Sequence, residues 1–280
     1  MRSATTLATR PHFRVTAVSC RDDHTRWSAP EVHGDYRVVL VRRGRFRRRA
    51  GGADADLDAT TAYVGVPGEE EHFAHPAGGD DCTSVSVTPA LWRTMAGDTA
   101  RPPAPSVYAD APLDLAHRRL LASARGGDVD YALAEELLGL LAATVARAVA
   151  APVPPRGRKD AALVAAAREA ITEAHPAADG LLPLAELLGA SPFRLSRAFT
   201  RELGVPLTRY RNRVRVARAL DRLEQGETGL AALAAELGFA DQSHLTRTLR
   251  HHLGRTPTSL RRLLSPAEDA PPPRGSGAGE

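Results

Sequence analysis

Two hydrophobic periods divide this chain, one typical of strands and the other of helices. Between residues 12 and 90, apolar and polar side chains alternate most clearly over 12–18 and 82–88, and 36–41 is rich in β-branched residues. Successive side chains of a strand point to opposite faces, so each run predicts a strand with one buried face. Glycine pairs and Pro67-Gly68 separate the runs as turns. Many short strands of this kind indicate a small β-sandwich or barrel.

The period lengthens to that of a helix in the second half of the chain. Leucines and small residues at three- or four-residue spacing predict one amphipathic helix over 130–150. The prolines of 151–157 stop it and indicate a stiff linker. Residues 158–265 follow as helices broken by glycine and proline. Residues 266–280, rich in proline and glycine, indicate a disordered tail.

An internal repeat is the most informative pattern. Residues 184–189 (LAELLG) return as 233–238 (LAAELG), and 195–204 (LSRAFTRELG) return as 245–254 (LTRTLRHHLG). Each copy predicts a short helix, a turn, an N-cap at Ser191 or Asp241, a second helix, and a stop at Gly204 or Gly254. This is the order of a helix-turn-helix unit. Two tandem copies with matching ends favour that interpretation over a plain helical bundle with solvated arginines.

The second helix of each copy combines an apolar inner face with a polar outer face. Arginine can bond guanine through two hydrogen bonds, glutamine can do so with adenine, and serine or threonine reach bases or phosphates. The pattern therefore predicts contact with double-stranded DNA in the major groove. The outward side chains are Arg194, Ser196, Arg197, Thr200 and Arg201 in the first copy, and Gln242, Ser243, His244, Thr246, Arg247 and Arg250 in the second.

The distribution of charge supports the same prediction. The chain carries 37 basic and 33 acidic side chains, a formal charge of +4. Residues 156–265 hold 18 basic and 11 acidic ones, hence +7, whereas residues 1–155 hold 18 and 19, hence −1. A surplus confined to the repeat region indicates a nucleic-acid partner. The sequence contains no long apolar run typical of a membrane span and no apolar signal segment, so we expect a cytoplasmic protein without a membrane partner.

Residues 158–264 resemble the DNA-binding domain of the AraC/XylS family of transcription regulators. The resemblance extends from 181–199 (LLPLAELLGASPFRLSRAF) through 204–220 to 233–250 and 253–261 (LGRTPTSLR). It implies two helix-turn-helix units joined by one long helix over about 207–224, with recognition helices in successive major grooves. It also implies RNA polymerase as a partner if the protein is an activator.

The family's base-contacting positions map onto Phe193, Ser196 and Arg197 in the first unit, and onto Gln242, Ser243, Thr246 and Arg247 in the second. One departure concerns Pro192 and Phe193, which stand where small polar residues could contact bases. Phe193 either contacts a thymine methyl group or is a half-buried core aromatic. We therefore expect the second unit to carry more of the sequence preference.

The family arrangement places a cupin-like β-barrel and dimerising helices before the DNA-binding domain. We therefore expect an α+β chain: a cupin-like regulatory domain over 1–100, a helical dimerisation segment over 101–150, the linker at 151–157, the double helix-turn-helix domain over 158–265, and the tail. The leucine stripe of 130–150 fits either intrachain core or pairing of two subunits in a homodimer. The segment 63–72 (YVGVPGEEEH) resembles the second cupin motif, whereas the first cupin motif is absent near 27–43.

The two cysteines of the chain each have a histidine nearby in sequence, Cys20 with His24 and Cys82 with His75. Thiolate and imidazole are the ligands that tetrahedral zinc prefers. The four residues are thus candidate zinc ligands, with His72, His33, Asp80 and Asp81 as substitute or supporting ligands. Two other interpretations stay open: inert buried cysteines and a reversible disulfide.

Two enzymatic alternatives are weaker. A cupin-type metalloenzyme tethered to DNA would need three or four clustered histidine and glutamate ligands, a spacing absent here. A DNA-repair regulator with a methyl-accepting zinc thiolate would need four cysteines, and the chain has two. We therefore expect no catalysis. The basic cluster of 42–49 (RRGRFRRR) is interpreted as a hairpin around Gly44, partly balanced by Asp54, Asp56 and Asp58, rather than as an auxiliary DNA contact.

Overall fold

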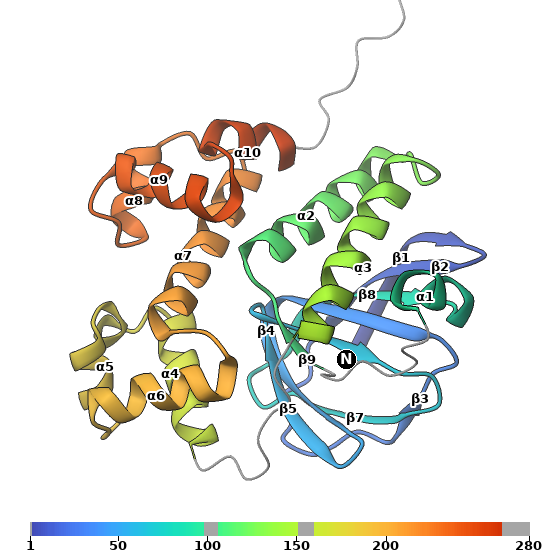
Figure 1. The fold of residues 1–280 in the computed structure, drawn as a ribbon, viewed down its shortest axis with the longest axis horizontal. Coiled ribbons are helices and arrows are strands. Elements are labelled where there is room, and N and C mark those ends of the chain that lie inside the picture. The colour runs from blue at the N-terminus through green and yellow to red at the C-terminus, as the bar shows by residue number, and fades with distance from the viewer. Residues whose placement is uncertain (1, 98–105, 151–159, 265–280) are drawn as a thin grey trace, which may run out of the picture.

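A computed structural model describes residues 2–97, 106–150 and 160–264 (Figure 1). Its first half is rich in strands and its second half is helical, as the α+β prediction requires. The predicted linker at 151–157 and the predicted tail at 266–280 lie outside the described residues.

Within the described residues, nine strands form the N-terminal barrel, in two layers that share strand β4. One layer has the order β1-β2-β8-β4-β6-β9, and the other joins β3, β7, β4 and β5. The alternation predicted from the sequence is visible in β8, where Thr83, Val85 and Val87 are buried while Ser84 and Ser86 are half-buried. The strands are β1 (Arg2–Arg10), β2 (Phe13–Cys20), β3 (Glu31–Val32), β4 (Tyr36–Ala50), β5 (Ala53–Asp58), β6 (Thr61–Gly65), β7 (Glu70–Ala74), β8 (Asp80–Val87) and β9 (Ser106–Tyr108).

Strand β4 corrects the hairpin predicted around Gly44. The strand continues through Gly44, and its first half pairs with β6 and β8 while its second half pairs with β5 and β7. Gly44 has φ +73°, and a β-carbon there would lie 2.3 Å from the backbone oxygen of Gly79. The glycine therefore serves a close approach of two strands. The hairpin turn lies instead at Gly51-Gly52, both of which have positive φ.

Helices cover one side of the barrel and form the whole C-terminal half (Figure 1). None of the helices within the described ranges is both long and apolar enough to cross a membrane. The helices are α1 (Pro89–Ala96), α2 (Ala111–Gly126), α3 (Ala132–Ala150), α4 (Ala161–Thr172), a 3-10 helix (Pro176–Asp179), α5 (Leu181–Leu187), α6 (Pro192–Leu203), α7 (Leu207–Glu224), α8 (Leu230–Glu236), α9 (Gln242–Leu253) and α10 (Pro257–Leu264).

The leucine stripe of α3 is intrachain core. Leu133, Leu137, Leu140 and Leu141 are at most 1% exposed and pack with the barrel and α2 in one apolar cluster. The burial of four leucines stabilises this helix against the sheet by several kcal/mol, at roughly 1.5–3 kcal/mol for each side chain. A different face of the same segment, with Tyr131, Leu138 and Val149, remains exposed.

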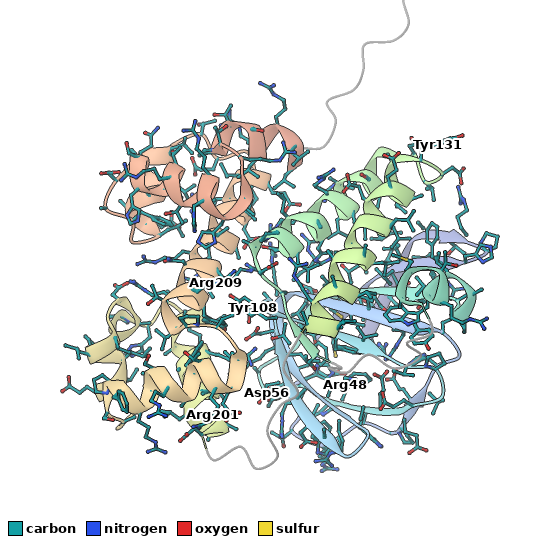
Figure 2. The ribbon with its side chains drawn as sticks, viewed as in Figure 1. Arg48, Asp56, Tyr108, Tyr131, Arg201 and Arg209 are labelled. Atoms are coloured by element: carbon teal, nitrogen blue, oxygen red, sulfur yellow. The ribbon has the colours of Figure 1, made fainter. Side chains whose placement is uncertain are left out.

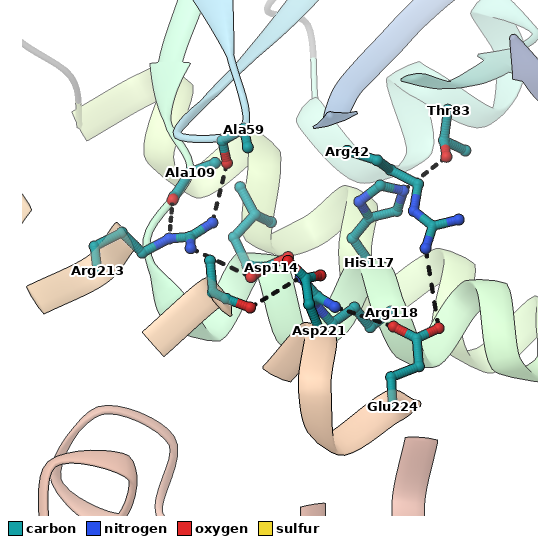
Figure 3. A network of polar contacts seen from close by, with 12 residues as sticks. Arg42, Ala59, Thr83, Ala109, Asp114, His117, Arg118, Arg213, Asp221 and Glu224 are labelled. Carbon is teal, nitrogen blue, oxygen red and sulfur yellow. Dashed lines mark hydrogen bonds and ion pairs between the residues drawn. The ribbon is translucent and has the colours of Figure 1, made fainter. Parts of the chain in front are cut away.

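The N-terminal domain contacts the C-terminal half through α2, which lies against α7 (Figure 3). Arg118 of α2 is buried and bonds three carboxylates: Asp114 at 3.1 Å, Asp221 at 2.8 Å and Glu224 at 3.0 Å. Arg213 of α7 donates to the backbone oxygens of Ala109 at 2.7 Å and Ala59 at 3.0 Å. Buried charges are tolerated when each is paired, as they are in this network.

A second contact joins the barrel to α4. Arg168 of α4 lies 2.6 Å from the Asp58 carboxylate of β5, and both side chains are nearly buried. Although burial opposes ionisation, Arg168 and the hydrogen bonds from Thr60 hold the pKa of Asp58 below its usual range. At the exposed margin of this contact, Arg45 of β4 bonds Glu169 at 2.6 Å. The N-terminal domain therefore contacts the helical half at two places, through α2 against α7 and through β5 against α4.

Candidate nucleic-acid interface and barrel cavity

Two helix-turn-helix units lie at opposite ends of α7, one formed by α5 and α6 and the other by α8 and α9 (Figure 1). The Ser191 hydroxyl accepts a hydrogen bond from the Arg194 backbone N–H at 3.2 Å, and the Asp241 carboxylate accepts one from His244 at 2.7 Å. Gly204 and Gly254 end α6 and α9 in the left-handed conformation. Both predicted N-caps and both glycine stops are confirmed, as are the bounds of the long joining helix.

Each unit has its own apolar core. Leu195 and Phe199 of α6 are fully buried and pack with Tyr210 of α7. Leu245 and Leu249 of α9 are buried in a cluster that also contains Leu115 of α2. The inward positions at i and i+4 thus orient each second helix, and the opposite face is left for a ligand.

The second unit presents its predicted contact residues to solvent. Gln242, Ser243 and Arg247 are exposed, and Thr246 is half-buried. His244 differs from the prediction in orientation, because its ring packs edge-on against Phe239 at 5.3 Å and its Nδ1 accepts from the Ala240 N–H at 3.4 Å. Within the described residues, Arg247 has no acidic partner, so its guanidinium stands unpaired on the outer face of α9.

The first unit is arranged differently. Phe193 is 70% exposed, which excludes the half-buried core position, and the Arg197 guanidinium stacks over its ring at 5.2 Å. Ser196 is half-buried. Arg194 and Arg201 both bond the carboxylate of Asp160, Arg194 at 2.8 Å. Figure 2 marks Arg201 on α6, where this pairing takes place.

The Asp160 pairing was not predicted from the sequence. Asp160 precedes α4 and lies 34 residues from Arg194 and 41 from Arg201, so no local spacing signals the contact. Hydrogen bonds from both arginines hold the pKa of Asp160 below its usual range. Two of the cations expected at the DNA surface are thereby partly neutralised within the chain.

The barrel contains a cavity of about 140 Å³ that is open to solvent on one side, and all four predicted zinc ligands line it. Strand pairing explains why: β2 and β8 are antiparallel, with Cys20 opposite Asp80 and Val18 opposite Cys82. His24 and His75 form a two-residue bridge at the cavity rim, each donating its backbone N–H to the other. The register of these strands therefore brings residues that are far apart in the sequence together at the cavity.

Cys20, His75 and Asp80 come closest together in this cavity. The Cys20 Sγ lies 3.5 Å from His75 Nε2, and His75 Nδ1 lies 2.9 Å from Asp80 Oδ1. One donor atom from each of the three lies within 4.8 Å of the others. His24 is not in this group: its Nδ1 is bonded to the Arg26 backbone oxygen at 2.9 Å. Cys82 lines the cavity but is also outside the group.

The two thiols are not paired with each other, and both cysteines are buried. Burial, and then the neighbouring Asp80 carboxylate, raise the pKa of Cys20 and of Cys82. Cys82 lies diagonally across the strand pair from Cys20. Diagonal partners are about 7–8 Å apart between Cα atoms, which exceeds the reach of an unstrained disulfide.

A buried ion pair borders the cavity and was also not predicted. Glu71 is 2% exposed and bonds Arg37 and Arg48, the latter at 2.6 Å. The Arg48 guanidinium lies over the Tyr63 ring at 4.5 Å. The sequence suggested that the cluster 42–49 is solvated, yet alternation along β4 points Arg48 inward while Arg49 bonds the exposed Asp54.

Comparisons with known proteins match this arrangement in part. Residues 184–263 match a family model described as a helix-turn-helix domain. The uncharacterized HTH-type transcriptional regulator YbfI of Bacillus subtilis is 40% identical over 62 residues, which is 22% of this chain and 22% of that protein. The alignment therefore spans about a fifth of the curated relative.

Solved structures give weaker likenesses. The C-terminal domain of AraT, a response regulator from Geobacillus stearothermophilus, is 25% identical and covers 40% of this chain and 93% of its own, with a TM-score of 0.37. ToxT from Vibrio cholerae is 9% identical and covers 91% and 99%, with a TM-score of 0.38. A cupin superfamily protein from Desulfitobacterium hafniense covers 31% and 78% at 11% identity and 0.28. Scores this low do not bear on function.

The caps, the cores and the matched family model together define the C-terminal half. It carries a helix-turn-helix domain. More particularly, it contains two such units joined by the single helix α7.

Proposed function

We propose that this protein is a cytoplasmic, sequence-specific transcription regulator of the AraC/XylS type that binds double-stranded DNA. The observation that carries the proposal is the placement of two capped recognition helices at the two ends of one rigid helix. The 18 residues of α7 rise about 27 Å. That length is compatible with two recognition helices in successive major grooves, whose spacing is roughly 34 Å.

The proposed roles follow from exposure. Arg247 and Gln242 contact base edges from α9, with Ser243 and Thr246 beside them. In α6, Arg197 contacts a base and the exposed Phe193 packs against a thymine methyl group. Arg194, Arg201 and His244 fill supporting roles, because each is already bonded or packed within the chain.

The decisive experiment compares cognate and random DNA. A footprint from genome-wide binding supplies the cognate site, and Arg247→Ala should weaken binding to it by about 1–3 kcal/mol and relax the preference at one base pair. Arg255→Ala, an exposed position that removes the same charge, is the matched control. Equal weakening by Arg247→Ala on cognate and random DNA would show a phosphate contact and contradict base readout.

We assign residues 1–100 to a regulatory domain that responds to an effector or metal, and 158–265 to DNA binding. Binding without catalysis suffices for this function, and RNA polymerase is a partner if the protein activates transcription. A homodimer through 130–150 would have to use the exposed face with Tyr131, Leu138 and Val149, since the leucine stripe is buried. A monomer in sedimentation at micromolar concentration would remove the homodimer from the proposal.

A further inference from the structure

Three donor atoms of different chemistry converge at the barrel cavity. Cys20 is 3% exposed and Asp80 is 3% exposed, and His75 is half-buried between them. A thiol, an imidazole and a carboxylate each offer one atom within 4.8 Å of the other two. They come from β2, from the end of β7 and its following loop, and from the start of β8.

His75 and Asp80 are in close contact at the cavity. The buried His75 Nδ1 and Asp80 Oδ1 atoms lie 2.9 Å apart, within ion-pair distance, but the contact does not have the geometry of a hydrogen bond. A buried polar atom without a well-formed hydrogen bond is costly, by about 1–3 kcal/mol. A cation bound by the carboxylate and the imidazole would offset this cost.

The donor set selects the class of cation. Oxygen-preferring ions such as Mg²⁺ and Ca²⁺ are not held by thiolate, whereas zinc takes sulfur, nitrogen and oxygen ligands together. Three protein ligands leave a fourth position of a tetrahedral ion unfilled by this group. The three residues line a cavity whose other walls include Phe46, Tyr63 and Phe73.

We propose that Cys20, His75 and Asp80 form a zinc-binding site that regulates the DNA-binding half of the same chain. This set differs from the four residues expected from sequence spacing, since Asp80 replaces Cys82 and His24 as a ligand. The regulatory part of the proposal rests on the proposed function, whereas zinc binding itself does not.

The loop between two of the ligands provides the connection to the helices. Pro76 and Ala77, directly after His75, line one hollow together with Arg168 and Glu169 of α4. Gly79, directly before Asp80, lies against Gly44 of β4. Arg45, which follows Gly44, bonds Glu169 of α4. A cation bound by His75 and Asp80 would therefore fix the loop beside α4, the helix that packs against α6 of the first helix-turn-helix unit.

Zinc binding is tested on the full chain by competition with a chromogenic chelator. We expect one Zn²⁺ per chain, with affinity lowered at least tenfold by Cys20→Ser, His75→Gln or Asp80→Asn. Cys82→Ser and His72→Gln, which change the same residue types outside the group, should retain affinity within about threefold. Equal loss with Cys82→Ser would overturn the ligand set, and a wild-type chain without stoichiometric zinc would overturn the site.

Two further measurements separate loss of ligand from loss of fold. Zn²⁺ should raise the melting temperature of the wild-type chain, because a ligand bound only to the native state stabilises it, and should not raise that of Cys20→Ser. Co²⁺ should give a thiolate charge-transfer band that disappears in Cys20→Ser. A band that survives this substitution would exclude Cys20 as a ligand.

Regulation is tested by operator affinity with and without Zn²⁺. We expect about a fivefold or larger change for the wild-type chain, at the lower end of ordinary allosteric coupling, and none for His75→Gln. Zinc that binds without changing DNA affinity would overturn the regulatory role. A chain that binds no DNA in either state would contradict the proposed function while the chelator result still decides the zinc site.

Discussion

The two helix-turn-helix units repeat one sequence pattern but differ in their contacts with the rest of the chain. The first unit has two of its arginines bonded to Asp160 and packs against α4, which contacts the barrel through the Asp58–Arg168 pair. The second keeps Arg247 unpaired and shares its core with Leu115 of α2. Duplication therefore preserved the caps and the inner faces, while the surroundings gave each copy its own electrostatic environment.

The largest expected effect comes from removing either buried arginine that fastens a unit. Arg168→Met should lower the free energy of unfolding by about 3–5 kcal/mol, because it leaves the buried Asp58 carboxylate without its cationic partner. Arg118→Met should cost less, since Asp114 keeps its contact with Arg213, Glu224 keeps its contact with Arg125, and Asp221 is 41% exposed. Denaturant unfolding measures the total.

Hydrogen exchange of backbone amides then shows which of the two units is destabilised. We expect Arg168→Met to increase exchange in α6 and Arg118→Met to increase it in α9. Arg222→Met is the control, because that arginine is 36% exposed and its surface pairs contribute at most about 1 kcal/mol. The same exchange pattern in both buried variants would show that the units are not fastened separately.

The next effect concerns sequence preference. Arg247→Ala should cost about 1–3 kcal/mol on cognate DNA, and Arg197→Ala should cost less, since Arg197 already stacks on Phe193. Competition binding against operators mutated under one unit at a time would check this order. A greater loss from Arg197→Ala would reverse the roles assigned to the two units.

A smaller effect should follow from releasing the paired arginines of the first unit. Asp160→Asn frees Arg194 and Arg201 for phosphates, so binding to random DNA should tighten and the plot of log affinity against log salt should steepen by about 0.9 for each new contact. Asp179→Asn makes the same charge change beside Arg211 and Arg215 of α7. If both variants behave alike, net charge rather than the Asp160 pairing sets the affinity.

The last expected effect is a pH dependence on the side of the second unit. His117 of α2 is buried and bonds Thr83 at 2.8 Å, and burial lowers its pKa to about 3 from the usual 6.5. Between these two pKa values the imidazole is protonated in the unfolded chain but not in the folded chain. The free energy of unfolding is therefore greatest above pH 6.5 and falls as the pH drops below it.

Unfolding measured across this range should separate His117 from other groups. The His117→Gln variant should lose less stability than the wild type between pH 6.5 and 4.5, by up to about 1.4 kcal/mol per pH unit. Parallel curves for the two proteins would show that His117 does not titrate differently in the folded state.

Local patterns predicted the parts of this fold that local physics determines. The caps at Ser191 and Asp241, the glycine stops and the bounds of α7 depend on side chains within a few residues. The bend of β4 through both layers depends instead on the approach of Gly79 to Gly44, which no short window contains.

The candidate sites divide in the same way. Exposure on α9 could be predicted from helical period, and Cys20 and His75 were suggested by residue type. Asp80 was suggested only as a substitute or supporting ligand, and the register of β2 with β8 places it opposite Cys20, whereas Asp160 became a partner only through packing of α4 on α6. Both contacts join segments separated by tens of residues.

Helix α7 also fixes the rotational phase between the two units. Each residue of a helix turns it by about 100°, so a single inserted alanine would swing α9 away from the face that α6 addresses. DNA has a matching constraint, because one added base pair turns the duplex by about 35°. We expect the chain to tolerate base changes between its two contacted segments but to reject a change in their number.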